Sequence, residues 1–401
     1  MSFSRREFGK LALAGVPAAA LLETPLFGTG FFQAKPNSKF GGVQIGVITY
    51  SYRSMPDQSA EATLKYIIDS GVSAVELMDG PVENYLGRPA APPRGGGAGG
   101  AGGGRGAAAA GAARPGGAGL PAGGGGGAAR GGGTPCVPGQ GRPAGAGGAG
   151  GGGGRGARGP APELTPEQQE AQRAAQAAAA TYAADLKKWR LGVSMDKVKA
   201  LRKMYNDAGV TMYAYKADGI GNKATLSDEE MDYMFNIAAA LGANHTTMEL
   251  PNPGQAGTDL LKRMAQFGEK HKIAVAYHTH AQGSMDCFDE ALAMSKWNMI
   301  NVDLGHYVGA GNKGGTPIEF LKKHHARISS FHLKDKMLEI NCGTTVAFGT
   351  GEGQLKEQLQ LIKANKWTFP ATIELEYAIP AGSDAVIETK KCVEYAKAAL
   401  A

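Results

Sequence analysis

The sequence predicts a single (β/α)8 barrel, and three observations support this prediction. From Val43 to the end of the chain, β-prone runs alternate with helical runs, and such regular alternation is typical of a parallel sheet. Eight strands and eight helices can be assigned in this way, which favours closure into a barrel over an open doubly wound sheet. No G-x-G-x-x-G pattern follows the first strand, which weakens the case for a dinucleotide-binding fold.

The elements follow one another at short intervals. The predicted strands are 43–50, 73–78, 210–216 and 244–249, and four more that end near 278, 303, 332 and 374. The predicted helices are 59–70, 165–190, 195–208, 228–241, 258–271, 317–325, 354–365 and 384–400. Gly71 is a stop signal for the first of these helices, and Thr165-Pro-Glu-Gln168 combines a cap with proline at the first helical position.

Two acidic residues mark the second predicted strand. Glu76 lies within it, where its side chain can reach the barrel interior. Asp79 follows the end of the strand, and we expect it to be solvated on the rim.

A low-complexity insert interrupts the second strand–helix unit. Residues 91–160 contain 33 of the 62 glycines. Without hydrophobic periodicity they cannot bury enough apolar surface to offset chain entropy, so we expect this segment to be disordered. The predicted organisation is a leader (1–34), a first part of the barrel (41–90), the insert (91–160) and the remainder of the barrel (161–401). The two barrel parts amount to roughly 290 residues, which suits one barrel.

The basic charge of the chain belongs to the insert. The formal net charge is +6, from 42 basic and 36 acidic residues. The insert has seven arginines and no acidic residue, so the rest carries 35 basic and 36 acidic residues, a net charge of −1. A nucleic-acid-binding surface requires basic residues on the folded body, so this charge gives no reason to expect a nucleic-acid partner.

The N-terminus resembles a twin-arginine export signal. Ser4-Arg-Arg-Glu-Phe-Gly-Lys10 precedes an apolar run, 11–22, which is shorter than the roughly 20 residues that span a bilayer. We therefore expect contact with the twin-arginine export machinery and a periplasmic location, with retention of the leader as an anchor left open. The four cysteines, which we interpret as incidental, show no C-x-x-C pairing and are Cys136, Cys287, Cys342 and Cys392.

Four successive strand-like segments end in residues that bind metals or transfer protons. They are 272–280, 299–306, 328–335 and 371–376. Because the carboxyl ends of parallel strands meet at one rim of a barrel, we expect one shared site. For the second segment taken alone, the alternative is that Asp303 caps the next element and His306 is a loop histidine.

These segments carry the motifs Asp303-x-x-His306, Phe331-His-Leu-Lys-Asp335 and Ile373-Glu-Leu-Glu-Tyr377. They resemble the xylose isomerase-like TIM barrel family, which includes sugar phosphate isomerases and epimerases, inosose dehydratases and endonuclease IV. The resemblance covers the chain outside the leader and the insert. It implies one divalent metal ion on the rim, held by His278, Asp303, His332 and Glu374. Such a mixed ligand set suits Mn²⁺ first, with Zn²⁺, Co²⁺, Fe²⁺ or Mg²⁺ as alternatives.

The resemblance implies a sugar isomerase or epimerase that removes a proton next to a metal-bound carbonyl of a small sugar or keto-sugar. The fifth strand departs from the pattern, because it ends His278-Thr-His280 where such epimerases usually have a glutamate that is both ligand and base. An H-x-H there resembles inosose dehydratases and barrels that cleave 3-keto-glycosides. A keto-sugar dehydratase or lyase, or a 3-keto-glycoside hydrolase, is therefore the alternative.

Further candidates complete the predicted site. The catalytic candidates are Glu249, His280, His306 and Lys334. Glu249 could instead be a fifth metal ligand or a helix cap. Lys334 could instead form an ion pair with Asp335. Glu352 lies in a Gly-Glu-Gly loop that resembles one in the family, which implies substrate binding.

Two other functions are less well supported by the residues. The three-metal cluster of endonuclease IV needs histidines from the second and third strands, and no histidine precedes His245 here. A non-catalytic sugar-binding barrel predicts an incomplete ligand set, whereas four ligand residues can be assigned. The sequence therefore predicts an enzyme without a nucleic-acid substrate.

Overall fold

The computed structural model describes residues 35–92, 138–139, 165–220 and 223–401, and these belong to one compact unit, residues 35–401. The leader and all of the insert except residues 91, 92, 138 and 139 lie outside the described residues. The predictions for them therefore stay predictions.

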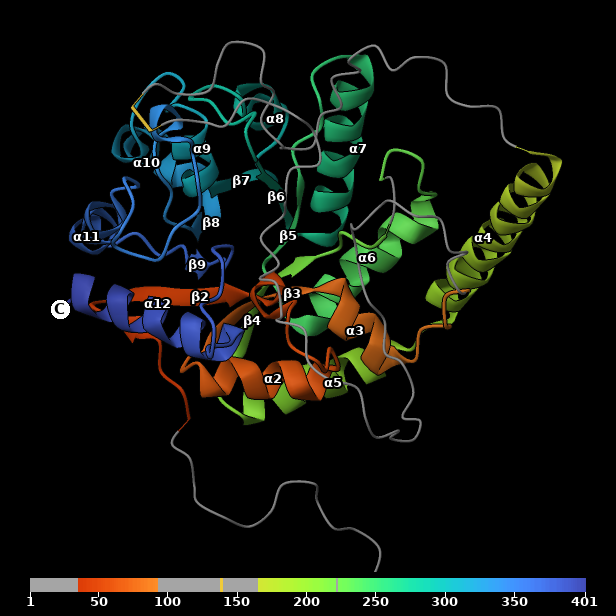
Figure 1. Cartoon of the computed structure of the whole chain (residues 1–401). Coiled ribbons are helices and arrows are strands. Elements are labelled where there is room, and N and C mark those ends of the chain that lie inside the picture. Colours follow the sequence, from red (N-terminus) through yellow and green to blue (C-terminus); the bar gives the residue numbers. More distant parts are fainter. Residues whose placement is uncertain (1–34, 93–137, 140–164, 221–222) are drawn as a thin grey trace, which may run out of the picture. The chain divides into compact units, whose positions relative to one another are not determined.

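Eight parallel strands close into a barrel (Figure 1). Each strand pairs in parallel with the next along the chain, and β2 pairs with β9 to close the ring, with Ile45 opposite Ala371. The strands are β2 (Val43–Ile48), β3 (Ala74–Met78), β4 (Thr211–Lys216), β5 (His245–Glu249), β6 (Ala274–His278), β7 (Asn298–Asp303), β8 (Ile328–Leu333) and β9 (Ala371–Ile373). The predicted (β/α)8 TIM barrel is thus confirmed.

A ninth strand of the described chain was not predicted. β1 (Lys39–Phe40) pairs antiparallel with β2 across a turn at Gly41 and Gly42, both of which have positive φ. Two residues are too few to show the period-2 pattern that identifies a strand.

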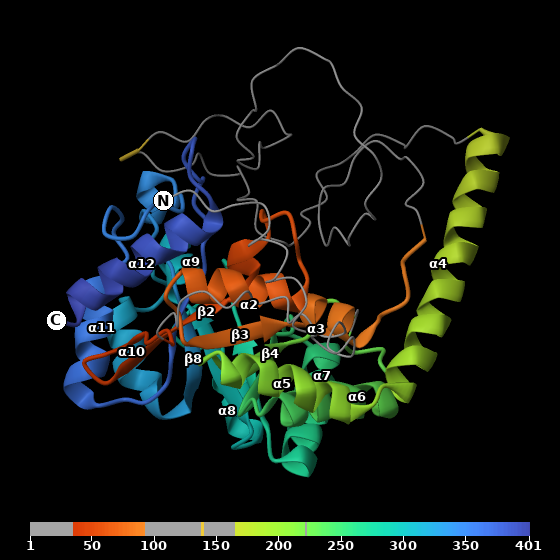
Figure 2. The same ribbon diagram turned by 90° about the horizontal axis from the view of Figure 1, so that it is seen from below.

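Helices connect the strands, and most of them cover the outside of the barrel (Figures 1 and 2). The longer ones are α2 (Ala60–Asp69), α4 (Pro166–Gly192), α5 (Met195–Asp207), α6 (Asp228–Leu241), α7 (Gln255–His271), α10 (Pro317–His324), α11 (Leu355–Asn365) and α12 (Ala385–Ala399). The shorter ones are α3 (Asp79–Leu86), α8 (Asp289–Met294), α9 (Leu304–Gly309) and the 3-10 turns η1 (Thr49–Tyr52), η2 (His325–Arg327) and η3 (Glu339–Asn341). All of the longer helices were predicted to within a few residues, and α3, α8 and α9 were not.

The cap signals in the sequence do start helices. The Thr165 hydroxyl accepts from the Gln168 amide at 3.2 Å, and the Gln168 side-chain oxygen accepts from the Thr165 amide at 2.9 Å. Thr316 and Glu319 form the same reciprocal pair at the start of α10. These bonds satisfy amides that a helix N-terminus leaves without partners.

Two expectations prove wrong in the described residues. Asp79 is buried, with 4% of its surface exposed, rather than solvated. Gly219 in the loop after β4 comes so close that a Cβ there would clash with the Asp79 carboxylate. Cys342 is disulfide-bonded rather than incidental, whereas Cys287 and Cys392 are free thiols.

Polar side chains fill the barrel interior near the carboxyl ends of the strands. Glu76, Asn301 and Ser330 are fully buried there, and Asn301 is hydrogen-bonded to both of the others. Apolar side chains such as Ile45 and Val47 are fully buried in the main hydrophobic core. Among the described helices, none combines the length and apolar character that crossing a bilayer requires.

Candidate metal centre

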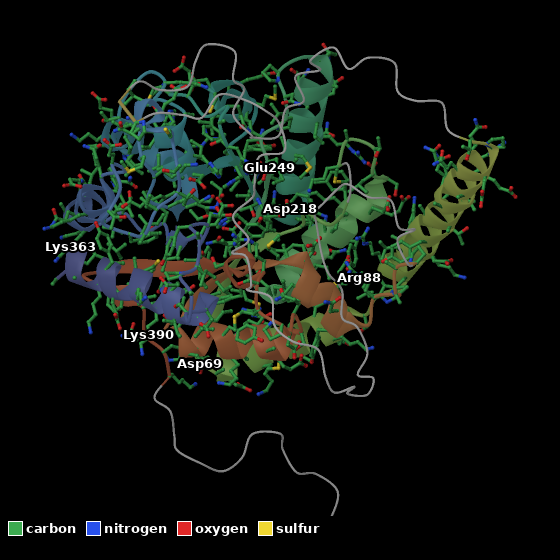
Figure 3. The ribbon with its side chains drawn as sticks, viewed as in Figure 1. Asp69, Arg88, Asp218, Glu249, Lys363 and Lys390 are labelled. Atoms are coloured by element: carbon green, nitrogen blue, oxygen red, sulfur yellow. The ribbon has the colours of Figure 1, made fainter. Side chains whose placement is uncertain are left out.

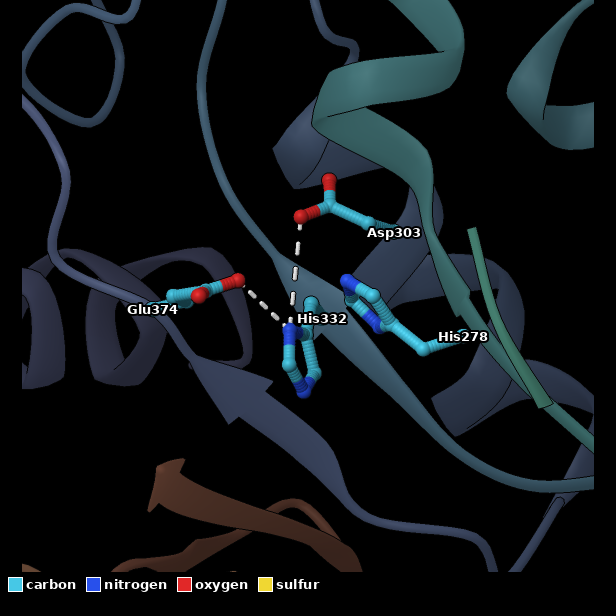
Figure 4. Close-up of side chains that lie close together, drawn as sticks. All are labelled: His278, Asp303, His332 and Glu374. Atoms are coloured by element: carbon cyan, nitrogen blue, oxygen red, sulfur yellow. Dashed lines mark hydrogen bonds and ion pairs between the residues drawn. The ribbon is translucent and has the colours of Figure 1, made fainter. Parts of the chain in front are cut away.

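Four side chains converge where neighbouring strands end (Figure 4). His278 is the last residue of β6, Asp303 is the last of β7, His332 is the penultimate residue of β8, and Glu374 directly follows β9. One potential ligand atom from each lies within 4.8 Å of the others, and all four side chains are buried. The structure therefore brings together the set that the sequence predicted.

Asp303 has one carboxylate oxygen committed to the backbone and one that faces the cluster. Oδ1 accepts from the His306 amide at 2.7 Å and caps α9. Oδ2 is buried and accepts no aligned hydrogen bond, although the Lys334 ammonium lies 2.8 Å away. Capping and metal binding are therefore compatible, because each uses a different oxygen. Burial opposes ionisation of Asp303, but the charge of Lys334 outweighs it and lowers its pKa.

The two histidines of the cluster differ in electrostatic environment. Burial and then Lys216 lower the pKa of His278 to about 3, so its imidazole is neutral. Burial also disfavours charge on His332, but Glu374 and Glu76 outweigh it and raise its pKa to about 10. His332 Nδ1 lies 2.6 Å from Glu374 Oε2, and Nε2 lies 3.0 Å from Glu76 Oε2.

Lys334 is a buried cation next to the cluster. Its Nζ lies 2.8 Å from Asp303 Oδ2, 3.0 Å from Glu374 Oε2 and 2.6 Å from Glu376 Oε2. Burial disfavours the ammonium, but Asp303 and Glu374 outweigh it and raise its pKa. Lys334 is therefore protonated at neutral pH and cannot act as a base.

The alternative ion pair between Lys334 and Asp335 does not form. The Asp335 carboxylate accepts instead from the amides of the glycine-rich loop, at Gly349 (2.8 Å), Gly351 (3.0 Å) and Gly353 (3.2 Å). Asp335 thus holds the loop against the end of β8.

A second group of polar side chains lies beside the cluster. His280 Nε2 is 3.6 Å from Glu249 Oε2, and the His280 ring stacks on the His306 ring with centroids 4.8 Å apart. Lys216 Nζ is 3.1 Å from Glu249 Oε1 and 3.4 Å from Asp218 Oδ2; Glu249 and Asp218 are labelled in Figure 3. Glu249 and His280 are about half exposed, so a ligand can reach them.

Glu249, His278 and His280 are also close enough to hold an ion. His278 Nδ1 is hydrogen-bonded to Asn301 Oδ1 at 2.8 Å, so only its Nε2 remains for a metal. The two groups therefore share one ligand atom, and together they offer one metal position rather than two.

Glu352 is engaged with a neighbouring loop. Its carboxylate accepts from the Leu338 amide at 2.7 Å and from Asn341 Nδ2 at 2.9 Å. These bonds order residues 336–345, where Lys336 and Thr345 form a β-bridge. The predicted contact with substrate stays a prediction.

Sequence reasoning missed four residues of the site, which are Lys216, Asn301, Glu76 in its role as a histidine partner, and Glu376. Lys216 ends β4 and Glu376 follows β9, so both carried the strand-end signal. Asn301 precedes Asp303 by two residues and so points to the same side of β7. That spacing was available in the sequence.

The donor set fits a divalent metal ion. Two imidazole nitrogens and two carboxylates form a mixed set that suits Mn²⁺, Fe²⁺, Co²⁺ or Zn²⁺. The Asp303 oxygen without an aligned donor is an atom of the kind that a cation satisfies. Four side chains also leave coordination positions open for a substrate.

Comparison with known proteins identifies the fold independently. The sequence model of the family described as xylose isomerase-like TIM barrel matches residues 169–394. Among solved structures, a xylose isomerase domain protein from Alicyclobacillus acidocaldarius is 10% identical, with a TM-score of 0.49 over 89% of this chain and 99% of that one. A sugar phosphate isomerase/epimerase from Parabacteroides distasonis is 12% identical, with a TM-score of 0.45 over 89% and 94%. A probable 3-DHS dehydratase from Bacillus anthracis is 10% identical, with a TM-score of 0.48 over 88% and 98%. No curated protein matches significantly.

Proposed function

Because this chain belongs to the xylose isomerase-like TIM barrel family, we propose that it is a divalent-metal-dependent isomerase or epimerase of a small sugar or keto-sugar. The observation that carries the proposal is the convergence of His278, Asp303, His332 and Glu374 within 4.8 Å, next to half-exposed groups that can transfer protons. Mn²⁺ is the proposed ion, with Zn²⁺, Co²⁺, Fe²⁺ and Mg²⁺ as alternatives.

Two residues next to the four ligands have different roles: Lys334 is a cation and His280 is a base. A divalent ion would supply the polarisation of a carbonyl that makes the proton on the neighbouring carbon removable. Lys334, a permanent cation, binds and orients a substrate oxygen. His280 takes the proton, because its imidazole is half exposed and Glu249, which stays ionised, lies beside it.

His306 is less available as a base than His280. A permanent ammonium only donates hydrogen bonds, so His306 Nε2 accepts from Lys334 Nζ at 3.0 Å. The lone pair of that nitrogen is thereby occupied. His306 therefore orients Lys334 and stacks against His280, and His280 with its neighbour Glu249 remains as the accessible proton-transfer pair.

A single base also supports a second candidate reaction. Epimerisation needs proton transfer on both faces of one carbon, whereas elimination from a keto-sugar begins with one proton removal. The end of β6 supplies His278 and His280 rather than a carboxylate. The second candidate is therefore a keto-sugar dehydratase or lyase, or a 3-keto-glycoside hydrolase.

Solvent exchange separates these reactions. The metal-loaded protein would be incubated in D₂O with a panel of keto-sugars and 3-keto-glycosides. Deuterium incorporation with recovery of an epimer or isomer supports the proposal, and loss of water or of an aglycone supports the second candidate. Absence of exchange with every compound would refute both and favour a sugar-binding barrel.

Metal content provides a separate test. Elemental analysis of the purified protein should show about one divalent ion per chain, since the side chains offer one position. Asp303→Ala should lose both this ion and exchange activity. A wild-type protein that binds no divalent ion when supplied with excess Mn²⁺ would contradict the proposal.

We further propose that the protein is exported by the twin-arginine route to the periplasm. The motif with Arg5 and Arg6 supports this, and so does the disulfide at Cys342, because disulfides persist in oxidising compartments. Fractionation of cells that express the full chain should recover it in the periplasm, and replacing both arginines with lysine should retain it in the cytoplasm. Periplasmic recovery of that variant would exclude the route.

A further inference from the structure

A carboxylate that a substrate cannot reach is buried beneath the four ligands. The Glu76 side chain is fully buried. Its Oε2 lies 3.0 Å from His332 Nε2 and 3.3 Å from Asn301 Nδ2, and its Oε1 accepts from the Thr247 hydroxyl at 2.7 Å. Every direct partner in this set is itself fully buried, so Glu76 acts only on protein groups.

Asn301 extends this network to the other histidine. Its Nδ2 donates to Glu76 Oε2 and to Ser330 Oγ, the latter at 2.7 Å. Both amide hydrogens are thereby used, which fixes the amide with Oδ1 facing His278 Nδ1 at 2.8 Å. An amide oxygen only accepts hydrogen bonds, so His278 carries its proton on Nδ1.

These contacts specify which nitrogen of each ring faces the ligand cluster. His332 donates from Nε2 to Glu76, which leaves Nδ1 toward Glu374 at 2.6 Å and Asp303 at 4.0 Å. His278 donates from Nδ1 to Asn301, which leaves Nε2. The two rings therefore present different nitrogens, and one carboxylate determines both orientations.

We propose that Glu76 is a positioning residue for the metal centre: it holds His332 directly and His278 through Asn301. The ligand atoms are then Nδ1 of His332 and Nε2 of His278. The inference rests on the metal site of the proposed function. A carboxylate behind a ligand histidine fixes its tautomer and increases its basicity.

Zinc is a suitable probe, because it is diamagnetic and accepts histidine and carboxylate ligands. The full chain, as wild type and as Glu76→Gln, would be titrated with Zn²⁺ by calorimetry. Glutamine keeps the shape and one acceptor oxygen but removes the charge. We expect Zn²⁺ affinity to fall on the order of 10- to 100-fold.

A matched control separates positioning from stability. Glu83 is another fully buried carboxylate, paired with Arg190 at 2.8 Å. Glu83→Gln should lower the unfolding midpoint while leaving Zn²⁺ affinity unchanged. A fall in affinity for Glu83→Gln as large as that for Glu76→Gln would overturn the inference, because general loosening of the fold would then explain both.

The ring nitrogens can be observed directly. Long-range ¹H–¹⁵N spectra of the zinc-loaded protein, labelled in its eight histidines, should show one ring bound through Nδ1 and one through Nε2. Asn301→Ala is a second variant in case Glu76→Gln fails to fold. It should shift the ring ¹⁵N signals of the histidine bound through Nε2 and leave those of the other histidine unchanged. Two rings bound through Nε2 in the wild type would overturn the inference.

The remaining outcomes distinguish this inference from the proposed function. Equal Zn²⁺ affinity of the wild type and Glu76→Gln, with unchanged ring signals, overturns the inference and leaves the proposed function intact. A folded wild-type protein that binds no divalent ion overturns the proposed function, and the inference with it.

Discussion

Replacing Asp79 with asparagine should make the protein more stable at neutral and alkaline pH. Asp79 Oδ2 is buried without a hydrogen-bond partner. Burial, followed by the charges of Glu83 and Asp218, raises the pKa of Asp79 to about 7 from 3.8. Asparagine keeps an acceptor for the Gly219 amide, which bonds Asp79, and turns the unpartnered oxygen into an NH₂ group next to these carboxylates. It carries no charge at any pH.

The sign and size of the effect follow from the pKa shift. The folded-state pKa lies above the unfolded value, so between about pH 4 and pH 7 the folded protein binds more protons than the unfolded chain. Stability therefore falls as pH rises through this window. A shift of about three units corresponds to about 4 kcal/mol as an upper limit, and adjustment of the surrounding loop reduces it, so we expect about 2–4 kcal/mol.

Urea unfolding at pH values from 4 to 8.5 measures this difference. The free energy of unfolding of Asp79→Asn minus that of the wild type should rise by about 2–4 kcal/mol from pH 4 to pH 8. Asp207→Asn is the control, because Asp207 is an exposed acid paired only with Lys203 on the surface. A constant difference across the range would refute the argument, since Asp79 would then have the same pKa in the folded and the unfolded chain.

Two further substitutions test other parts of the structure. Arg190→Ala removes the partner that lies 2.8 Å from the buried Glu83. The free energy of unfolding in urea should fall by about 3–5 kcal/mol. A fall below about 1 kcal/mol would mean that Tyr233 and Arg88 suffice as partners of Glu83. Lys334→Met should reduce the rate of solvent exchange on the order of 10²- to 10³-fold with metal content retained, and an unchanged rate would exclude Lys334 from contact with the reacting oxygen.

Local patterns in the sequence predicted the periodic elements and the strand ends. Helix 228–241 was predicted with its observed bounds. In the structure it runs for nearly four turns, and Ser227 and Glu230 form a capping box at its start. The short helices α8 and α9 contain six residues each, which is less than two turns and too short for a helical period to show. The strand-end residues indicated one shared rim site, and the resemblance to the xylose isomerase-like family implied which four of them are ligands.

Asp79 shows where local reasoning fails. Its place directly after a strand suggested solvent, but Gly219 and the loop after β4 cover it. Its burial depends on a segment remote in sequence, so no pattern around Asp79 indicates it. Glu76 is similar, since His332, its partner, lies 256 residues away.

The strand sequences nevertheless indicate part of the polar network that supports the metal centre. A strand buried on both faces normally reads as a continuous apolar run, yet Asn301-Val-Asp303, Ser330-Phe-His332 and Thr372-Ile-Glu374 each carry two polar residues in alternation. Residues two apart point to the same side of a strand, so Asp303, His332 and Glu374 each have a polar neighbour beneath them, whereas His278 has Ala276. Burying such a neighbour costs free energy unless it is hydrogen-bonded.

Each of these neighbours has a partner. Asn301 bonds Glu76 and His278, Ser330 bonds Asn301, and the Thr372 hydroxyl lies 2.7 Å from the Tyr213 hydroxyl. The barrel therefore holds a ligand layer on a polar supporting layer. Since an apolar layer would pack at lower cost, the polar layer is accounted for by what it holds in place.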